Sequence, residues 1–507
     1  MLAPDYLDHA PDRLVLLWQQ AEDDILRDVA RRIGRMDTLT PTANWQLWRY
    51  QQTEAVRKDV VKLLARYTGK SEAEIRRLMK EAATAALEAE DAIYFHYGKE
   101  PTPFEESTPL QNLLTAGYRQ TAGSFSNLTA TTANTVSGAF EQALDRAWLQ
   151  VSSGAFDYKT AVKRAVDGLA DSMPYVTYPS GHRDTLEVAC RRAVLTGVNQ
   201  TGAKLQEARM DEMGASFVEV TAHGGARPSH AVWQGRRYHR GGAVDYLGQH
   251  YEDFESATGY GTGAGLCGWN CRHTFFVVFP ELGSPPAWTQ ESLEALNARD
   301  IEYDGGLYTR YEISQMQRAR ERAVRKWKRR YLAEDAAGAD TAASAVKLRQ
   351  ARQELAAFTR ATGGRVDSAR TSVHGFGRSE GSKASYAARK QERFNAANTE
   401  LQQMREAGTI KAKGRLIESP SAPNEINFAS DHVLQRWAER GMGPMDAERI
   451  IRSSKVAMSQ RNGTQTCYYS ELGFVAIGQD GNVSSIGPLD EGGKKLMEVV
   501  KKHGIPH

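Results

Sequence analysis

The sequence predicts a multidomain protein that is predominantly α-helical, with a small central α/β unit and a C-terminal α+β domain in which helices precede an antiparallel sheet. Three observations predict this class. The chain has 507 residues, too many for a single hydrophobic core. Apolar residues recur at helical spacing over most of its length. Short β-type runs bounded by glycine and proline are concentrated near residues 220 and 275 and after residue 464.

Composition is that of a soluble globular protein, with 41% hydrophobic and 25% charged residues and a net charge of only +3. Any nucleic-acid surface must therefore come from local clustering of charge. Four cysteines in so long a chain do not make a disulfide framework, which favours a reducing compartment. We see no signal peptide, and no apolar run approaches the roughly 20 residues of a membrane span. We therefore expect no membrane anchor, and a protein kept in a cytoplasm or packed into a particle assembled there.

Residues 1–184 are expected to form a helical region. Its first helix carries Leu14 and Trp18 at helical spacing after Pro11, which suits a first turn. Ser71 starts a capping-box pattern that predicts the beginning of another helix. Residues 120–136 are small and polar and are consistent with a loop or a weak helix.

Residues 185–285 are expected to form the central α/β unit. An amphipathic helix, which Gly197 could interrupt, leads into the β-type runs SFVEVTA and HTFFVVFP. Long loops rich in glycine, histidine and arginine lie between these runs, and loops of this length are usually functional or disordered. Residues 286–361 return to helix and include a strongly basic one. Residues 362–414 are expected to hold a linker and a charged helix.

Residues 415–507 are expected to form the C-terminal α+β domain. One helix is predicted to begin near Ser430 or Asp431 and to end at Gly441, and the run DAERIIRSS predicts a second. Three β-type runs follow, TQTCYYSE, GFVAIGQ and NVSSIGPL. An Asp-Gly turn at Gly481 joins the last two as a hairpin.

The segment GLCGWNCRHTFF contains a candidate metal site. Cys267, Cys271 and His273 offer two thiolates and one imidazole for a structural zinc. His223, His230 and His239 lie upstream as candidates for a fourth ligand, and of these we take His230. The spacing departs from common zinc motifs, and no second pair repeats it. The alternative is a glycine-rich turn that buries Trp269 and Cys271. Catalysis is disfavoured because no partner carboxylate stands at a recognisable spacing.

The same region carries a family resemblance. The sequence runs GARPSHAVWQGRRY and then, some thirty residues later, GYGTGAGLCGWNCRHTFFVVFPE. In its order of Arg-x-Ser-His, Trp-x-Gly, Tyr-Gly and Cys-Gly-x-Asn-Cys-Arg-His, it resembles the phage minor capsid proteins, distant relatives of the Mu-type head morphogenesis proteins. We extend the resemblance over roughly residues 1–340. It implies a virion protein near the portal of the phage head, assembled in the host cytoplasm. Its implied partners are portal, capsid and scaffold proteins and phage DNA, during assembly, packaging or ejection.

The basic helix in residues 310–330 has two interpretations. The first is that it pairs with acidic neighbours, as charge runs usually do. The second, favoured by the resemblance to a head component, is that it contacts DNA phosphates without sequence preference. The candidate DNA-binding residues are Arg318, Arg322, Arg325, Lys326, Arg329 and Arg330.

The C-terminal domain resembles, more weakly, the barnase-, EndoU-, colicin- and RelE-type nucleases (the BECR-like fold) that occur as toxin domains behind phage minor capsid proteins. His432, Arg436 and either Glu439 or Arg440 share one face of the predicted helix, and we take Arg440 as the candidate. Metal-free RNA cleavage needs such an acid–base group beside cations. Further candidate residues are Arg461, Tyr469 and Ser485. The alternatives are that His432 merely packs its helix, or that the domain is an inactive relative kept for binding. Enzyme activity therefore stays open, and no enzyme activity is expected of the capsid-like part.

Overall fold

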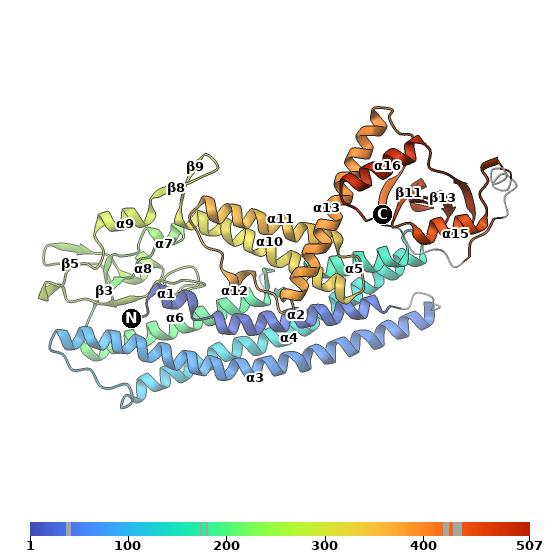
Figure 1. Cartoon of the computed structure of the whole chain (residues 1–507). Helices are drawn as coiled ribbons and strands as arrows, with labels where there is room; N and C mark the ends of the chain where they lie inside the picture. The colour runs from blue at the N-terminus through green and yellow to red at the C-terminus, as the bar shows by residue number, and fades with distance from the viewer. Residues whose placement is uncertain are drawn as a thin grey trace. The chain divides into compact units, whose positions relative to one another are not determined.

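The chain folds into two compact units: an N-terminal unit, Met1–Glu380, and a C-terminal unit, Gly381–His507. A computed structural model describes residues 1–36, 42–172, 175–178, 181–418, 425–428, 435 and 439–506 (Figure 1). Within these residues the predicted class is confirmed: helices predominate, and the C-terminal unit joins helices to an antiparallel sheet. Over the same part of the chain, no helix has both the length and the apolar character of a membrane span.

Long helices packed side by side form most of the N-terminal unit (Figure 1). Their shared core includes Leu14, Trp18, Phe125 and Phe140. The helices are α1 (Pro4–His9), α2 (Asp12–Gly34), α3 (Thr42–His96), α4 (Thr108–Ser152), α5 (Tyr158–Ser172), α6 (Leu186–Met213), α10 (Arg310–Ala336) and α11 (Ala342–Ala361). The basic helix is α10, and it packs against α2, α5 and α11.

The predicted helix start at Ser71 is wrong, because Ser71 lies in the middle of the continuous helix α3. Its hydroxyl donates to the carbonyl of Tyr67 and accepts a hydrogen bond from the Trp18 indole at 2.9 Å, and the side chain is fully buried. The serine therefore serves a contact between helices. Residues 120–136, for which the sequence left a loop or a weak helix open, lie within the continuous helix α4.

Gly197 does not interrupt α6 but lets α6 approach α4 closely. A Cβ atom at Gly197 would lie 2.2 Å from Oγ1 of Thr121, and one at Gly117 would lie 2.1 Å from Oγ1 of Thr201. Each helix thus places a glycine against a threonine of the other helix, four residues from its own threonine. Both glycines are required by this close approach rather than by a bend.

A three-stranded antiparallel sheet in the order β4-β3-β7 lies beside the helices. Its strands are β4 (Arg237–His239), β3 (Phe217–Val220) and β7 (Phe275–Val277), and the last two are the predicted β runs. Val218 pairs with Tyr238 on one side and with Val277 on the other. The smaller elements of the unit are β1 (Tyr175–Thr177), β2 (Arg183–Thr185), α7 (Pro228–Ala231), β5 (Val244–Tyr246), β6 (Gln249–Tyr251), α8 (Phe254–Thr258), η1 (Pro280–Leu282), α9 (Gln290–Asn297), β8 (Arg299–Tyr303), β9 (Gly306–Thr309) and α12 (Ser368–Thr371).

The C-terminal unit is a five-stranded antiparallel meander in the order β10-β11-β12-β13-β14, covered by helices on both faces. One face packs against α13 and α16 through residues such as Leu401, Cys467 and Leu496. The other packs against α15 through residues such as Ile450 and Val475. The elements are α13 (Arg378–Glu406), β10 (Arg415–Glu418), α15 (Pro444–Ser453), β11 (Val456–Gln460), η2 (Arg461–Gly463), β12 (Gln465–Ser470), β13 (Gly473–Gly478), β14 (Val483–Gly487) and α16 (Glu491–Lys502). The three predicted strands and the helix at α15 are confirmed, whereas β10, β11 and α16 were not predicted. The helix predicted from Ser430 or Asp431 to Gly441 lies mostly outside the described residues.

Candidate functional site

A glycine-rich loop before β7 presents Cys271. The loop folds back on itself through hydrogen bonds from the Leu266 amide to Thr258 and from the Trp269 amide to Gly263. A Cβ atom at Gly265 would lie 2.0 Å from a backbone oxygen, and one at Gly268 would lie 2.4 Å from another. These two positions therefore require glycine, because backbone packs directly on backbone. The fold of the loop thus sets Cys271 and His273 in the short segment that leads into β7.

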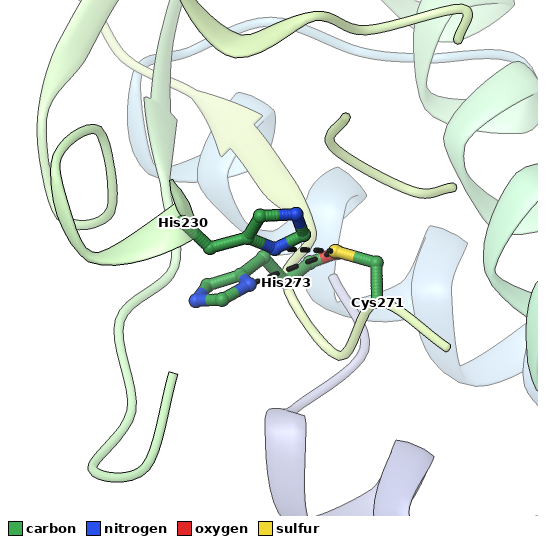
Figure 2. Close-up of side chains that lie close together, drawn as sticks. All are labelled: His230, Cys271 and His273. Carbon is green, nitrogen blue, oxygen red and sulfur yellow. Dashed lines mark hydrogen bonds between the residues drawn. The ribbon is translucent and has the colours of Figure 1, made fainter. Parts of the chain in front are cut away.

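Cys271, His230 and His273 form one buried cluster (Figure 2). Their ligand atoms all lie within 4.8 Å of one another, and the side chains are only 1–2% exposed. Sγ of Cys271 is 3.7 Å from Nδ1 of His230 and 3.6 Å from Nδ1 of His273. Helix α7 supplies His230, so residues more than forty positions apart meet here. A group of this kind could hold a metal ion.

Both imidazole rings are oriented by hydrogen bonds on their far side. Nε2 of His230 is 2.9 Å from the carbonyl oxygen of Ala264, and Nε2 of His273 is 3.0 Å from Oε1 of Gln234. Carbonyl oxygens only accept, so each Nε2 carries the proton and each Nδ1 keeps a lone pair directed at the sulfur. Burial lowers the pKa of His230 to about 4 and that of His273 well below its ordinary value. Both rings are therefore neutral at pH 7, as metal ligands must be.

Asn199 of α6 holds the Cys271 loop through two hydrogen bonds. Its amide donates at 3.0 Å both to the Cys271 carbonyl and to the His273 carbonyl. Cys267, which the sequence placed among the ligands, lies outside the cluster; its thiol donates to the His273 carbonyl at 3.6 Å. The alternative turn placed Trp269 in the interior, but Trp269 is 60% exposed and only Cys271 is buried.

The cluster faces a cavity of about 1000 Å³. Helices α1, α2, α6, α10 and α12 and the Cys271 loop enclose it, and eight arginines but only five carboxylates are among the described residues that line it. The lining charged residues are Asp8, Asp12, Glu187, Arg191, Arg192, Arg227, Arg272, Arg318, Glu321, Arg322, Arg325, Asp367 and Arg370. The cavity is thus strongly basic.

Four of the six basic residues singled out on α10 are ion-paired inside the unit. Arg325 pairs with Glu187 of α6, and Arg329 contacts Glu22 at 2.8 Å and Asp23 at 2.7 Å. Arg330 pairs with Asp167 at 2.5 Å, and Lys326 pairs with Asp171 at 3.1 Å. These charges attach α10 to α2, α5 and α6. Arg318 and Arg322 have no carboxylate within 4 Å among the described residues, and both line the cavity.

The candidate nuclease residues that the structure describes lie on several elements of the C-terminal unit. Arg461 is exposed at the turn between β11 and β12, whereas Tyr469 is buried at the opposite end of β12. Ser485 is half-buried on β14, and the Arg440 guanidinium donates to the Ile486 carbonyl at 2.6 Å. Burial raises the pKa of Tyr469. His432 and Arg436 lie outside the described residues.

Sequence reasoning missed three residues of the site: Gln234, Asn199 and Asp8. Gln234 lies within the Trp-x-Gly motif, so its position next to a named motif was a usable signal. Asn199 and Asp8 act from 72 and more than 250 residues away from the loop, respectively. No local pattern reports such contacts.

The model of the family described as phage minor capsid protein 2 matches residues 2–360. No curated protein and no solved structure matches this chain.

Proposed function

The chain belongs to the phage minor capsid protein 2 family, and we propose on that premise that it is a component of the virion, carried in the phage head near the portal. The observation that carries this proposal is the extent of the match, which takes in nearly all of the N-terminal unit. The portal, capsid and scaffold proteins would be its partners, and assembly would take place in the host cytoplasm.

Fractionated virions test this placement. After heads and tails are separated, the chain should be found with the heads by mass spectrometry, and cross-linking should join it to the portal protein. The major capsid protein and a tail protein serve as fractionation controls. Finding the chain only in the tail fraction, or losing it completely when intact virions are washed, would contradict the placement.

We propose further that Cys271, His230 and His273 hold a zinc ion that fixes the loop. Tetrahedral zinc with bonds of about 2.3 Å to sulfur and about 2.05 Å to nitrogen separates the two ligand atoms by about 3.6 Å. The sulfur–nitrogen distances here are 3.7 and 3.6 Å. The far-side hydrogen bonds from both rings are the usual support for histidine ligands. The cluster thus supplies three ligands.

Elemental analysis of the purified full chain should find about one zinc per chain. Cys271→Ser should lose the ion, whereas Cys267→Ser, a neighbouring buried thiol outside the cluster, should keep it. Retention of zinc by Cys271→Ser, or its loss only in Cys267→Ser, would refute this ligand set.

We also propose that the N-terminal unit contacts DNA phosphates at the basic cavity, through Arg318 and the exposed Arg322. Support comes from the absence of an ion pair on either residue within the described part of the chain. Two phosphate contacts predict that log affinity falls with log salt with a slope of about −2. The double variant Arg318→Gln/Arg322→Gln should flatten that slope, and an unchanged slope would exclude these residues.

A ribonuclease effector in the C-terminal unit is the second candidate function. The observation that favours it is that this unit, with its own two cores, lies outside the matched range 2–360. If the proposal holds, the full chain should cut RNA without added metal, and His432→Ala should reduce cutting by at least about a hundredfold. Equal cutting by wild type and His432→Ala would remove His432 from the mechanism.

A further inference from the structure

Arg318 carries an unsatisfied charge inside the basic cavity. Among the described residues its side chain has no hydrogen-bond partner and no carboxylate within 4 Å. Burial, together with Arg370 nearby, lowers the pKa of its guanidinium to about 10, so the group is still charged at pH 7. A guanidinium that lines a cavity without a protein acceptor leaves its N–H donors available to a ligand.

The arginines around Arg318 share too few carboxylates to balance their charges. Asp8 of α1 lies 2.7 Å from Arg191, 3.4 Å from Arg272 and 3.9 Å from Arg370. Burial alone would raise the pKa of Asp8, but these guanidinium groups and that of Arg318 hold it below its ordinary value. One carboxylate thus faces four arginines that come from α6, the Cys271 loop, α10 and α12.

Only part of this excess is balanced elsewhere. Arg191 also contacts Asp12 at 3.3 Å, and Arg370 also contacts Asp367 at 3.1 Å. Within the described residues, Arg272 has no carboxylate other than the shared Asp8, and Arg318 has none within 4 Å. Two guanidinium charges therefore lack a counter-charge of their own.

We propose that this part of the cavity binds a phosphate group, with Arg318 and Arg272 as its main donors and Arg370 and Arg191 at its edge. A dianionic oxyanion matches two uncompensated charges, and guanidinium groups pair with phosphate oxygens in a planar, bidentate way. The cavity volume of about 1000 Å³ is at the upper end of ordinary ligand pockets, so there is room for more than the phosphate itself. The inference goes beyond the proposed DNA contact because it requires no nucleic acid.

Calorimetric titration of the full chain with inorganic phosphate tests the site, at constant ionic strength with chloride as the reference anion. Saturable binding of about one phosphate per chain is expected. Arg318→Gln should weaken it at least about tenfold, since a charge-assisted hydrogen bond contributes that much or more. Arg310→Gln, on the same helix but outside the cavity, should bind like wild type. No saturable binding by wild type, or equal affinity in Arg318→Gln with its fold intact by circular dichroism, overturns the proposal.

Two further titrations distinguish the sources of the phosphate. A short single-stranded oligonucleotide with a 5′-phosphate should compete with inorganic phosphate if the site takes strand ends, while its unphosphorylated counterpart should not. If neither oligonucleotide competes, the site takes the free anion. If the chain binds phosphate but not DNA, the phosphate site is supported and only the proposed DNA contact is contradicted. If both oligonucleotides compete equally, the site does not recognise a terminal phosphate.

Discussion

Replacing Gly197 with alanine tests the close packing of α4 on α6. In an ordinary helix interior this change stabilises by about 0.5–1 kcal/mol, because alanine has the better helix propensity. Here the new methyl group would lie 2.2 Å from Oγ1 of Thr121, about 1 Å inside the contact distance. Thr121 cannot turn away without cost, since its hydroxyl donates to the Gly117 carbonyl at 2.9 Å. Overpacking of this kind costs about 1–3 kcal/mol, so the net effect is destabilisation.

The assay is urea unfolding of the full chain, followed through the transition of the N-terminal unit. Gly138→Ala is the matched control, because that glycine lies in α4 with nothing within 4 Å of a Cβ atom. Gly138→Ala should raise the free energy of unfolding, and Gly197→Ala should lower it. In the double variant Gly197→Ala/Thr121→Ala, part of that loss should be recovered. Equal stabilisation by the two alanine variants would refute the packing argument.

Three further predictions concern the charges, the histidines and the C-terminal core. Arg329→Met should destabilise the N-terminal unit by about 3–5 kcal/mol, because it leaves the two buried carboxylates of α2 unpaired, whereas Arg322→Met at an exposed position should change its stability by no more than about 0.5 kcal/mol. Equal effects of the two variants in unfolding experiments would contradict the pairing of Arg329. The metal-free chain should lose stability as pH falls from about 6.5 to about 4, because the pKa of His230 is about 4 in the folded state and the unfolded chain takes up the proton at higher pH. In thermal melts, the melting temperature of His230→Gln should fall less steeply with pH than that of wild type, and identical pH profiles would contradict this role of His230. Tyr469→Ala should destabilise the C-terminal unit by about 3–5 kcal/mol, whether or not that unit cuts RNA, because the ring is buried beneath α13 and α16. A melting transition unchanged from wild type would contradict the burial of this ring.

The predictable part of the fold is the part set by local pattern. Strands β3, β7, β12, β13 and β14 follow alternating or apolar runs, and α15 follows its helical spacing. The errors arose where a distant residue decided the local outcome. Ser71 reads as a helix start until Trp18 is seen to donate to it, and Gly197 reads as a break until Thr121 is placed against it.

The same limit applies to the candidate site. Spacing pointed to Cys271, His273 and His230, but it gave equal standing to Cys267 because thiols four positions apart cannot be ranked without the loop's own fold. On α10 the run of basic residues was clear from the sequence. The carboxylates that pair with four of them lie on other helices, 138 to 307 residues away in sequence. The local sequence therefore could not show which arginines stay unpaired.

X-ray absorption at the zinc edge of the purified full chain tests the metal centre most directly. The account predicts one sulfur at about 2.3 Å and two imidazole nitrogens at about 2.0–2.1 Å, with a further light-atom ligand. Replacement of Cys271 by serine should abolish the sulfur contribution, and replacement of Cys267 should leave it intact. A chain without zinc, or a zinc with two sulfur ligands that include Cys267, would contradict the account.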